Sequence, residues 1–261
     1  MTIGRKSVCG ASRWPGGAAA ALLAVLVGGC ASGPSGGIAD PLEPLNRAVF
    51  RFNEVADGLV IEPAAELYGL VVPEAGRTSL RNFLDNAGSP VVFVNDLLQL
   101  ERERAGVTLA RFMINTFFGG LGLFDAARHF GHVRHEEDFG QTLAVWGVGD
   151  GAYLVLPILG PSSLRDATGS AVDGFLLDPA VYIAPSDARL AARVADGVDT
   201  RYRLDPVIED LRANAMDRYA TVRTVYQQRR QAAIANGRAT AADPDYEAIF
   251  QDPEAEDGTS N

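Results

Sequence analysis

Residues 104–118 read RAGVTLARFMINTFF, and this stretch decides what kind of helical protein the chain forms. Its polar side chains, Arg104, Thr108, Arg111 and Asn115, follow one another at the i, i+4, i+7 and i+11 spacing of one helical face. Apolar side chains cover most of the remaining surface. We therefore expect a helix with a narrow polar seam and a broad apolar face.

Two interpretations of this helix are open. It is either a central core helix of a water-soluble protein, or a helix whose apolar sides face lipid while the seam faces a polar interior. At about 1.5 Å per residue the stretch is about 20 Å long, whereas the hydrocarbon core of a bilayer is roughly 30 Å thick. It is therefore able to lie in one leaflet but too short to cross.

The rest of the body is typical of a mainly α protein, because Pro and Gly separate long segments and period-2 alternation is scarce. Pro63 and Pro73 are expected to open the second and third helices. The first segment, before Pro63, carries apolar residues at helical spacing: Leu45, Val49, Phe52, Val55, Ala56 and Leu59.

One Ser-Pro pair and one Asp-Pro pair predict helix starts further along the chain. Ser89-Pro90 predicts an N-cap and first turn leading into a helix over Val91–Leu100. Asp205-Pro206 predicts the start of the longest helix, running to about Ala235 and ending at Asn236-Gly237. One buried face of that helix is expected to carry Leu211, Ala215, Tyr219, Val222 and Tyr226.

One non-helical stretch interrupts the pattern at residues 150–161, where Gly and Pro bracket apolar residues. This predicts a short extended hairpin. Pro161 to Asp166 then starts a helix on which Asp166 and Asp173, seven residues apart, share a face. We expect one mainly α domain over residues 40–237, with several helices and this one hairpin.

The N-terminal end predicts export. Residues 1–29 carry Arg5, Lys6 and Arg13, then an apolar run too short to span a bilayer, and the order is that of a secretory signal. The junction LVGGC at residues 26–30 resembles the lipobox of bacterial lipoproteins, so Cys30 is expected to be the lipid-bearing first residue of the mature chain. Residues 30–39 are then a flexible tether, and Ala31-Ser32 implies sorting to the outer membrane.

Charge excludes one class of partner. Without residues 1–29 the chain has 20 basic and 33 acidic residues, because the signal carries three of the 23 basic ones and none of the acidic ones. Nucleic acid is therefore not expected as a partner.

Seven of the acidic residues follow Arg238, and we expect residues 238–261 to be a disordered acidic tail. Cys9 lies in the signal, so the mature chain keeps one cysteine and no internal disulfide.

Two enzymatic or metal-binding hypotheses fit the residues poorly. His129, His132 and His135 lie at i, i+3 and i+6 next to acidic residues, but this spacing spreads them around a helix, and Gly131 interrupts it. A metal site is not expected. The chain lacks the Gly-x-Ser-x-Gly elbow of a lipid hydrolase, and Ser162 and Ser163 precede a helix, where capping is the usual role. We expect no catalytic residues and no cofactor besides the lipid on Cys30.

An ordered set of short motifs across residues 40–180 resembles the MlaA (VacJ) family of outer-membrane lipoproteins. Similarity is looser through the C-terminal helix to about Gly237, and residues 185–203 differ in detail. The matching residues are Asp40-Pro41-Leu42-Glu43, Asn46-Arg47, Phe52-Asn53, Arg111-Phe112, Asn115-Thr116, Phe139-Gly140, Thr142-Leu143, Gly147-Val148-Gly149, Leu156-Pro157, Gly160, Leu164-Arg165-Asp166 and Asp173-Gly174.

The resemblance implies a helical ring or disc embedded in the periplasmic leaflet of the outer membrane and often held by porin trimers. Its channel is expected to take mislocalised phospholipid from the outer leaflet. The lipid passes to a soluble periplasmic carrier that feeds an inner-membrane ABC complex, which maintains lipid asymmetry without chemical change. The alternative is a structural or adaptor lipoprotein that only docks on porins. Direction of net transport and headgroup preference do not follow from the resemblance.

The resemblance also implies a set of lipid-channel residues. Ala167 and Ser170 stand where relatives often carry acidic residues, which bears on the charge of the channel mouth. A simpler role for Arg165 and Asp166 is a capping or ion pair at a helix start. The candidate residues are Asn46, Asn53, Arg111, Asn115, Pro157, Gly160, Arg165, Asp166 and Asp173.

Overall fold

The computed structural model describes residues 40–236. The predicted signal, the Cys30 lipid site with its tether, and the acidic tail lie outside these residues. The first half of the described chain is helical throughout. It comprises α2 (Glu43–Ala56), the π-helical turn η1 (Asp57–Ile61), α3 (Glu62–Val71), α4 (Glu74–Leu98), α5 (Arg102–Phe117) and the 3₁₀ turn η2 (Ala126–Phe130).

The second half begins with a short helix and an antiparallel hairpin, in which Tyr153 pairs with Ser163 and Leu156 with Gly160. Helices follow to the end of the described chain. The elements are α6 (Phe139–Val145), β1 (Tyr153–Leu156), β2 (Gly160–Ser163), α7 (Leu164–Val172), the π turn η3 (Asp173–Leu177), α8 (Ala180–Ile183), α9 (Ser186–Asn214) and α10 (Arg218–Ile234).

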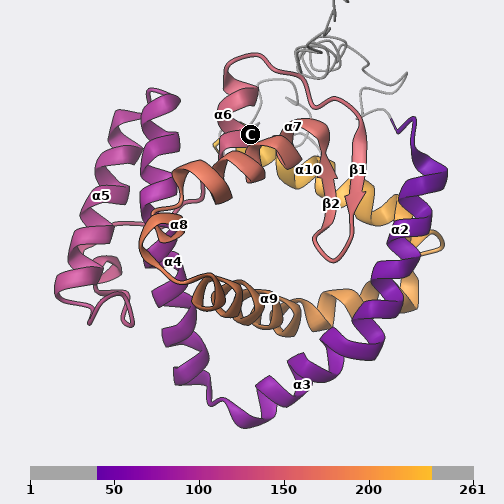
Figure 1. The fold of residues 1–261 in the computed structure, drawn as a ribbon, viewed down its shortest axis with the longest axis horizontal. Helices are drawn as coiled ribbons and strands as arrows, with labels where there is room; N and C mark the ends of the chain where they lie inside the picture. The colour runs from indigo at the N-terminus through magenta and orange to yellow at the C-terminus, as the bar shows by residue number, and fades with distance from the viewer. Residues whose placement is uncertain (1–39, 237–261) are drawn as a thin grey trace, which may run out of the picture.

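These elements form a ring (Figure 1). Helices α2, α3 and α4 follow its rim, and α5 packs against α4 on the outside. Helix α9 contacts α3 and α4, and α10 contacts α6 and β2. The hairpin contacts α2 and points toward the middle of the ring. The expected mainly helical domain with one short hairpin is confirmed.

Two predicted helix starts are wrong. Helix α4 continues through Pro90 and α9 through Pro206, so neither proline opens a helix. Ser89 is not an N-cap: its hydroxyl donates to the carbonyl of Asp85 at 3.0 Å, four residues back. This is the bond to the carbonyl one turn back that serine side chains make inside helices, and the carbonyl that Pro90 leaves without its helical donor is that of Asn86.

The single C-terminal helix predicted to reach Ala235 is in fact two helices. The chain becomes extended at Ala215, and the Asp217 side chain caps α10 by accepting from the Ala220 N–H. The predicted face from Leu211 to Tyr226 is therefore split between α9 and α10. The predicted end is confirmed, since α10 stops at Ile234 and Asn236 has a φ of 53°.

The residue types that are buried and exposed are the reverse of those in a water-soluble protein. Within residues 40–236, six apolar residues are buried against sixteen polar or charged ones. Many large apolar side chains are exposed, among them Leu59 at 73%, Leu70 at 85% and Phe118 at 81%. Such a surface is typical of a protein that meets lipid. None of the helices described has the length and apolar character needed to span a bilayer.

Candidate functional site

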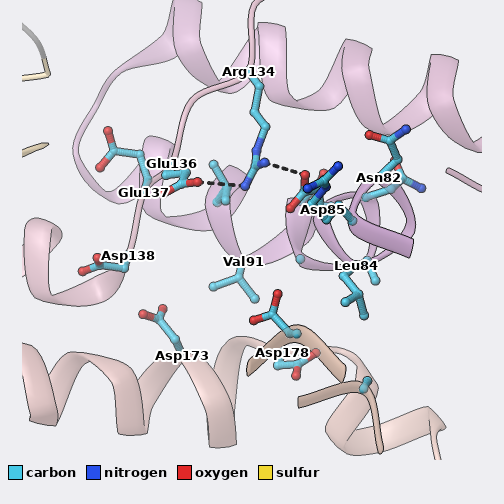
Figure 2. A pocket seen from close by; sticks show the side chains of 18 of the residues that line it. Asn82, Leu84, Asp85, Val91, Arg134, Glu136, Glu137, Asp138, Asp173 and Asp178 are labelled. Carbon is cyan, nitrogen blue, oxygen red and sulfur yellow. Dashed lines mark hydrogen bonds and ion pairs between the residues drawn. The ribbon is translucent and has the colours of Figure 1, made fainter. Parts of the chain in front are cut away.

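The ring encloses a cavity of about 880 Å³ that is lined mostly by polar and charged residues. Its walls come from α4, α5, α7, α9, α10, the η3–α8 segment and the loop 134–138. Figure 2 shows carboxylates from several of these elements pointing into the same space, among them Asp85, Asp173 and Asp178. Eight carboxylates and seven guanidinium groups line the cavity, so its wall carries both signs in near balance.

Part of this charge is held in ion pairs. Arg134 bridges Asp85 of α4 and Glu136, as the dashed lines of Figure 2 show. Arg111 binds Asp125 at 2.9 Å. These pairs fix the cavity wall, because an isolated charge away from water is costly and a paired one much less so.

Helix α9 supplies one wall with a stripe of lining residues at helical spacing: Arg189, Arg193, Asp196, Thr200 and Arg203. Arg203 is paired, its Nε lying 2.9 Å from Asp199. Arg189, Arg193 and Asp196 form no ion pair within the described chain. The stripe therefore presents unpaired charge of both signs to the cavity.

The cavity also raises the pKa of several acids. Partial burial raises the pKa of Asp85 and of Asp196, and Arg134 and Arg203 counteract this. Burial likewise raises the pKa of Asp173, although the Phe139 N–H and the Asn95 amide donate to its carboxylate at 2.8 and 2.9 Å. The site thus holds carboxylates that lack full solvation and would gain from a cation.

The polar seam of α5 faces inward, as the second interpretation of residues 104–118 predicts. Thr108 and Asn115 are buried, whereas Leu109 and Phe117 are 47% and 71% exposed. Arg111 and Asn115 both line the cavity. The Asn115 amide donates to Asp125 at 3.2 Å and its carbonyl accepts from the Ala127 N–H at 2.8 Å. The core-helix interpretation is therefore wrong.

His135 contacts Asp96 and Thr108 at the cavity wall without forming a nucleophile relay. The same ring nitrogen, Nε2, lies 3.0 Å from Asp96 and 3.2 Å from Thr108, and the threonine hydroxyl itself donates to Asp96 at 2.7 Å. A relay needs the base to accept from the hydroxyl with one nitrogen and bind the acid with the other. Among residues 40–236 no cluster of His, Cys, Asp and Glu is suited to hold a metal ion.

The candidates Asn46 and Asn53 support the hairpin rather than line the cavity. The Asn46 amide donates to the carbonyl of Tyr153 and its oxygen accepts from the Val155 N–H, at 2.9 and 3.0 Å. Asn53, two turns later on α2, does the same with Leu156 and Ile158, at 2.9 Å each. Each side chain completes the hydrogen bonds of a strand edge.

Pro157 lies in the turn of the hairpin and Gly160 begins β2 directly after it, and both are absent from the cavity lining. The Leu159 N–H donates to the Pro157 carbonyl at 2.8 Å, and Gly160 has a φ of 82°. That backbone conformation favours glycine. Both residues therefore have a clear part in the turn.

Arg165 and Asp166 form an ionic hub that ties α7 to α10. Arg165 lies 2.6 Å from Asp150 and 3.0 Å from Asp166. Asp166 accepts from the Tyr226 hydroxyl and lies 2.8 Å from Arg230, which also binds Asp138. Burial opposes ionisation of Asp138, but the Arg230 contacts outweigh it and lower its pKa. This is the ion-pair role considered for Arg165 and Asp166.

Close packing of two glycines makes room for this hub. A Cβ on Gly140 would lie 2.5 Å from an Arg230 nitrogen, and one on Gly169 would lie 2.3 Å from the backbone nitrogen of Gly140. Helices α6 and α7 therefore approach each other without side chains between them.

Of the nine candidate lipid-channel residues predicted from the sequence, three line the cavity: Arg111, Asn115 and Asp173. The other six lie elsewhere.

The comparisons with known proteins agree with this architecture. The family model described as MlaA lipoprotein matches residues 38–233. The chain belongs to the MlaA lipoprotein family. The family predicted from the motifs is therefore confirmed.

Relatives in the MlaA family cover most of the chain. The Intermembrane phospholipid transport system lipoprotein MlaA of Escherichia coli (strain K12) is 35% identical over 225 residues, covering 84% of this chain and 88% of its own. The protein of the same name from Haemophilus influenzae is also 35% identical, covering 76% and 80%. An uncharacterized protein of Rickettsia felis is 34% identical, covering 75% and 78%.

A solved structure from work on the structural basis for maintenance of bacterial outer membrane lipid asymmetry has the same fold. It superposes with a TM-score of 0.69 at 33% identity, covering 75% of this chain and 99% of that one.

The sequence did not predict the α9 cavity residues Arg189, Arg193 and Asp196. Their i, i+4 and i+7 spacing was the available signal, but residues 185–203 differ from the family motifs.

Proposed function

We propose that the protein is an outer-membrane lipoprotein that carries mislocalised phospholipid out of the outer leaflet through its central cavity. One observation carries the proposal: a ring with an apolar exterior encloses a cavity lined by charge of both signs. Passing a charged headgroup through hydrocarbon is expensive, and a charged path lowers that cost. The name of the relatives, intermembrane phospholipid transport system lipoprotein, supports this function.

The placement in the membrane is part of the proposal. Apolar residues of α2, α3 and α5 would contact lipid in the periplasmic leaflet, since Phe52, Leu70 and Phe117 are 54%, 85% and 71% exposed. The lipid on Cys30 would deliver the chain to the outer membrane and orient it, and the apolar surface would add to its hold.

The partners are also proposed. A porin trimer would hold the ring in the membrane, and a soluble periplasmic carrier would receive the lipid and feed an inner-membrane ABC complex. The charged cavity favours a conduit over an adaptor that only docks on porins, because docking needs no polar interior. The Asp96–His135–Thr108 geometry gives no support to a lipid hydrolase.

Lipid transfer tests the proposal. Purified protein is placed in vesicles containing fluorescent phospholipid, and transfer to a purified periplasmic lipid carrier of the same organism is followed over time. We expect transfer faster than from protein-free vesicles, with the lipid recovered intact. Transfer no faster than the protein-free rate would contradict a conduit, and release of lysolipid or fatty acid would favour a hydrolase.

A further inference from the structure

The α9 face of the cavity carries charges that the described protein leaves without partners. The Arg189 Nε is buried and donates no hydrogen bond among residues 40–236. Arg193 makes one long contact, from Nη2 to the Gly174 carbonyl at 3.4 Å. Arg189 is half-buried, and its buried nitrogen would normally be satisfied, whereas Arg193 is exposed to the cavity with only this long contact. Both guanidinium groups are therefore suited to an anion that arrives with the ligand.

Asp196 lies on the same face of α9 and carries a charge opposite to that of the two arginines. Arg203 of the same helix and Arg134 of the facing loop attract the Asp196 carboxylate, whereas Asp199, Glu136 and Asp85 of α4 repel it, but Asp196 forms no ion pair among residues 40–236. Arg134 already binds Asp85 and Glu136. Asp196 therefore remains as a carboxylate available to a cation.

The spacing along α9 suits one small ligand carrying both charges. Arg193 and Asp196 are three residues apart, about 4.5 Å along the helix axis, and Arg189 lies one turn beyond Arg193. In an ethanolamine headgroup only an ester oxygen and two carbons separate the phosphorus from the amine nitrogen. A phosphate on the arginines therefore leaves the ammonium within reach of Asp196.

We propose that this α9 face selects phospholipids with a zwitterionic, primary-amine headgroup, binding the phosphate with Arg189 and Arg193 and the ammonium with Asp196. The inference rests on the proposed transport function. An anionic headgroup such as glycerol phosphate supplies the phosphate but no cation, so it brings no partner for the Asp196 carboxylate. Partial burial raises the pKa of Asp196, which agrees with a carboxylate that has no ion-pair partner within the described chain.

Competition between two lipids tests this selection. Vesicles carrying the full protein contain phosphatidylethanolamine and phosphatidylglycerol together, with identical acyl chains and two distinguishable labels, and transfer of each to the carrier is timed. We expect phosphatidylethanolamine to move about tenfold faster, the effect of one charge-assisted hydrogen bond. Equal rates, or faster phosphatidylglycerol transfer, would overturn the headgroup inference and leave the transport function standing. Transfer of neither lipid would instead overturn the transport function.

Two variants assign the charges. Asp196→Asn should bring the two rates within about twofold of each other by slowing phosphatidylethanolamine. Arg193→Gln should slow both lipids by a similar factor, because both carry the phosphate. Asp187→Asn, on the same helix and outside the cavity lining, is the matched control and should keep the wild-type ratio. A wild-type ratio in Asp196→Asn would contradict the role of Asp196.

Folding of each variant is checked by circular dichroism in detergent before transfer is measured. The ratio of two lipids within one sample is insensitive to the amount of folded protein, because both lipids use the same molecules. A partial loss of folded Asp196→Asn therefore leaves the ratio unchanged, whereas loss of the ammonium partner changes it.

Discussion

The hairpin side and the α4–α5–α9 side of the ring are stabilised in opposite ways. On the hairpin side Tyr153, Val155 and Tyr219 form a small apolar core, packed by partly buried residues that include Val49 and Tyr226. On the other side polar residues line a cavity, and the apolar side chains of α5 face outward.

The difference teaches where substitutions should affect folding and where they should affect lipid handling. The hairpin side closes the ring through buried hydrogen bonds and ion pairs from α2, α7 and α10. The cavity side leaves charges unpaired and apolar groups exposed, which stabilises the isolated chain little but suits lipid on one side and a headgroup on the other. Four substitutions test this division.

The largest effect is expected at the ionic hub. Asp166→Ala leaves Arg165, Tyr226 and Arg230 without a shared acceptor in a site where Asp166 is about nine-tenths buried. We expect a loss of about 3–5 kcal/mol in the free energy of unfolding, measured by denaturant titration in detergent. Asp150→Ala, which removes a half-exposed partner of Arg165, should cost much less. Equal losses would contradict the hub.

Next in size is the bond between α2 and the hairpin. Asn46→Ala leaves the Tyr153 carbonyl and the Val155 N–H without partners inside the protein, and we expect a loss of about 2–3 kcal/mol in the free energy of unfolding. Asn53→Ala is the matched control. Asn53 makes the equivalent two hydrogen bonds near the exposed turn, where water replaces them after the substitution. A larger loss at Asn53 would show that depth of burial does not set the cost.

The outer face of α5 should act on membrane binding and not on folding. Phe117 and Phe118 are 71% and 81% exposed, so replacing both with Ser removes little packing within the protein. We expect the free energy of unfolding in detergent to change by less than about 0.5 kcal/mol. Association of the Cys30→Ser chain with vesicles, measured by flotation, should fall by at least tenfold. Unchanged flotation would place this face away from lipid.

The smallest effect is a pH-dependent gain in stability. The folded pKa of Asp196 is raised, so the native state holds its proton more tightly than the unfolded chain, and this contribution is lost as pH rises through the folded pKa. Asp196→Asn should therefore melt about 1–2 °C higher than wild type at pH 7, with the difference vanishing below about pH 4. A lower melting temperature at pH 7 would mean that Asp196 has a stabilising partner.

The sequence predicts the parts of this fold that depend on local pattern. The seam from Arg104 to Asn115 predicts a helix with one polar face and leaves two interpretations of its apolar face open, and the Gly and Pro residues of 150–161 predict the hairpin. It fails at Pro90 and Pro206, because helix packing overrides the local rule that places a proline at a helix start. The break at Ala215 to Asp217 was missed, although Asp217 is a common N-cap residue.

The candidate site was predicted only in part, for a physical reason. Motif residues such as Asn46 and Asp166 have hydrogen-bond partners 60 to 109 positions away in the chain, so a motif cannot tell a structural contact from a cavity wall. The α9 stripe is visible as spacing, but which side of α9 faces the cavity depends on its packing against α3 and α4.

Blocking the cavity tests the central claim most directly. Ala192 lines the cavity and its neighbour Ala191 does not, so Ala192→Cys and Ala191→Cys place the same thiol on different sides of α9. Each variant is treated with a bulky methanethiosulfonate, and lipid transfer to the carrier is measured before and after reduction. The conduit predicts that modified Ala192→Cys loses transfer and regains it on reduction, while Ala191→Cys is unaffected. Equal transfer by both modified variants would contradict passage through the cavity.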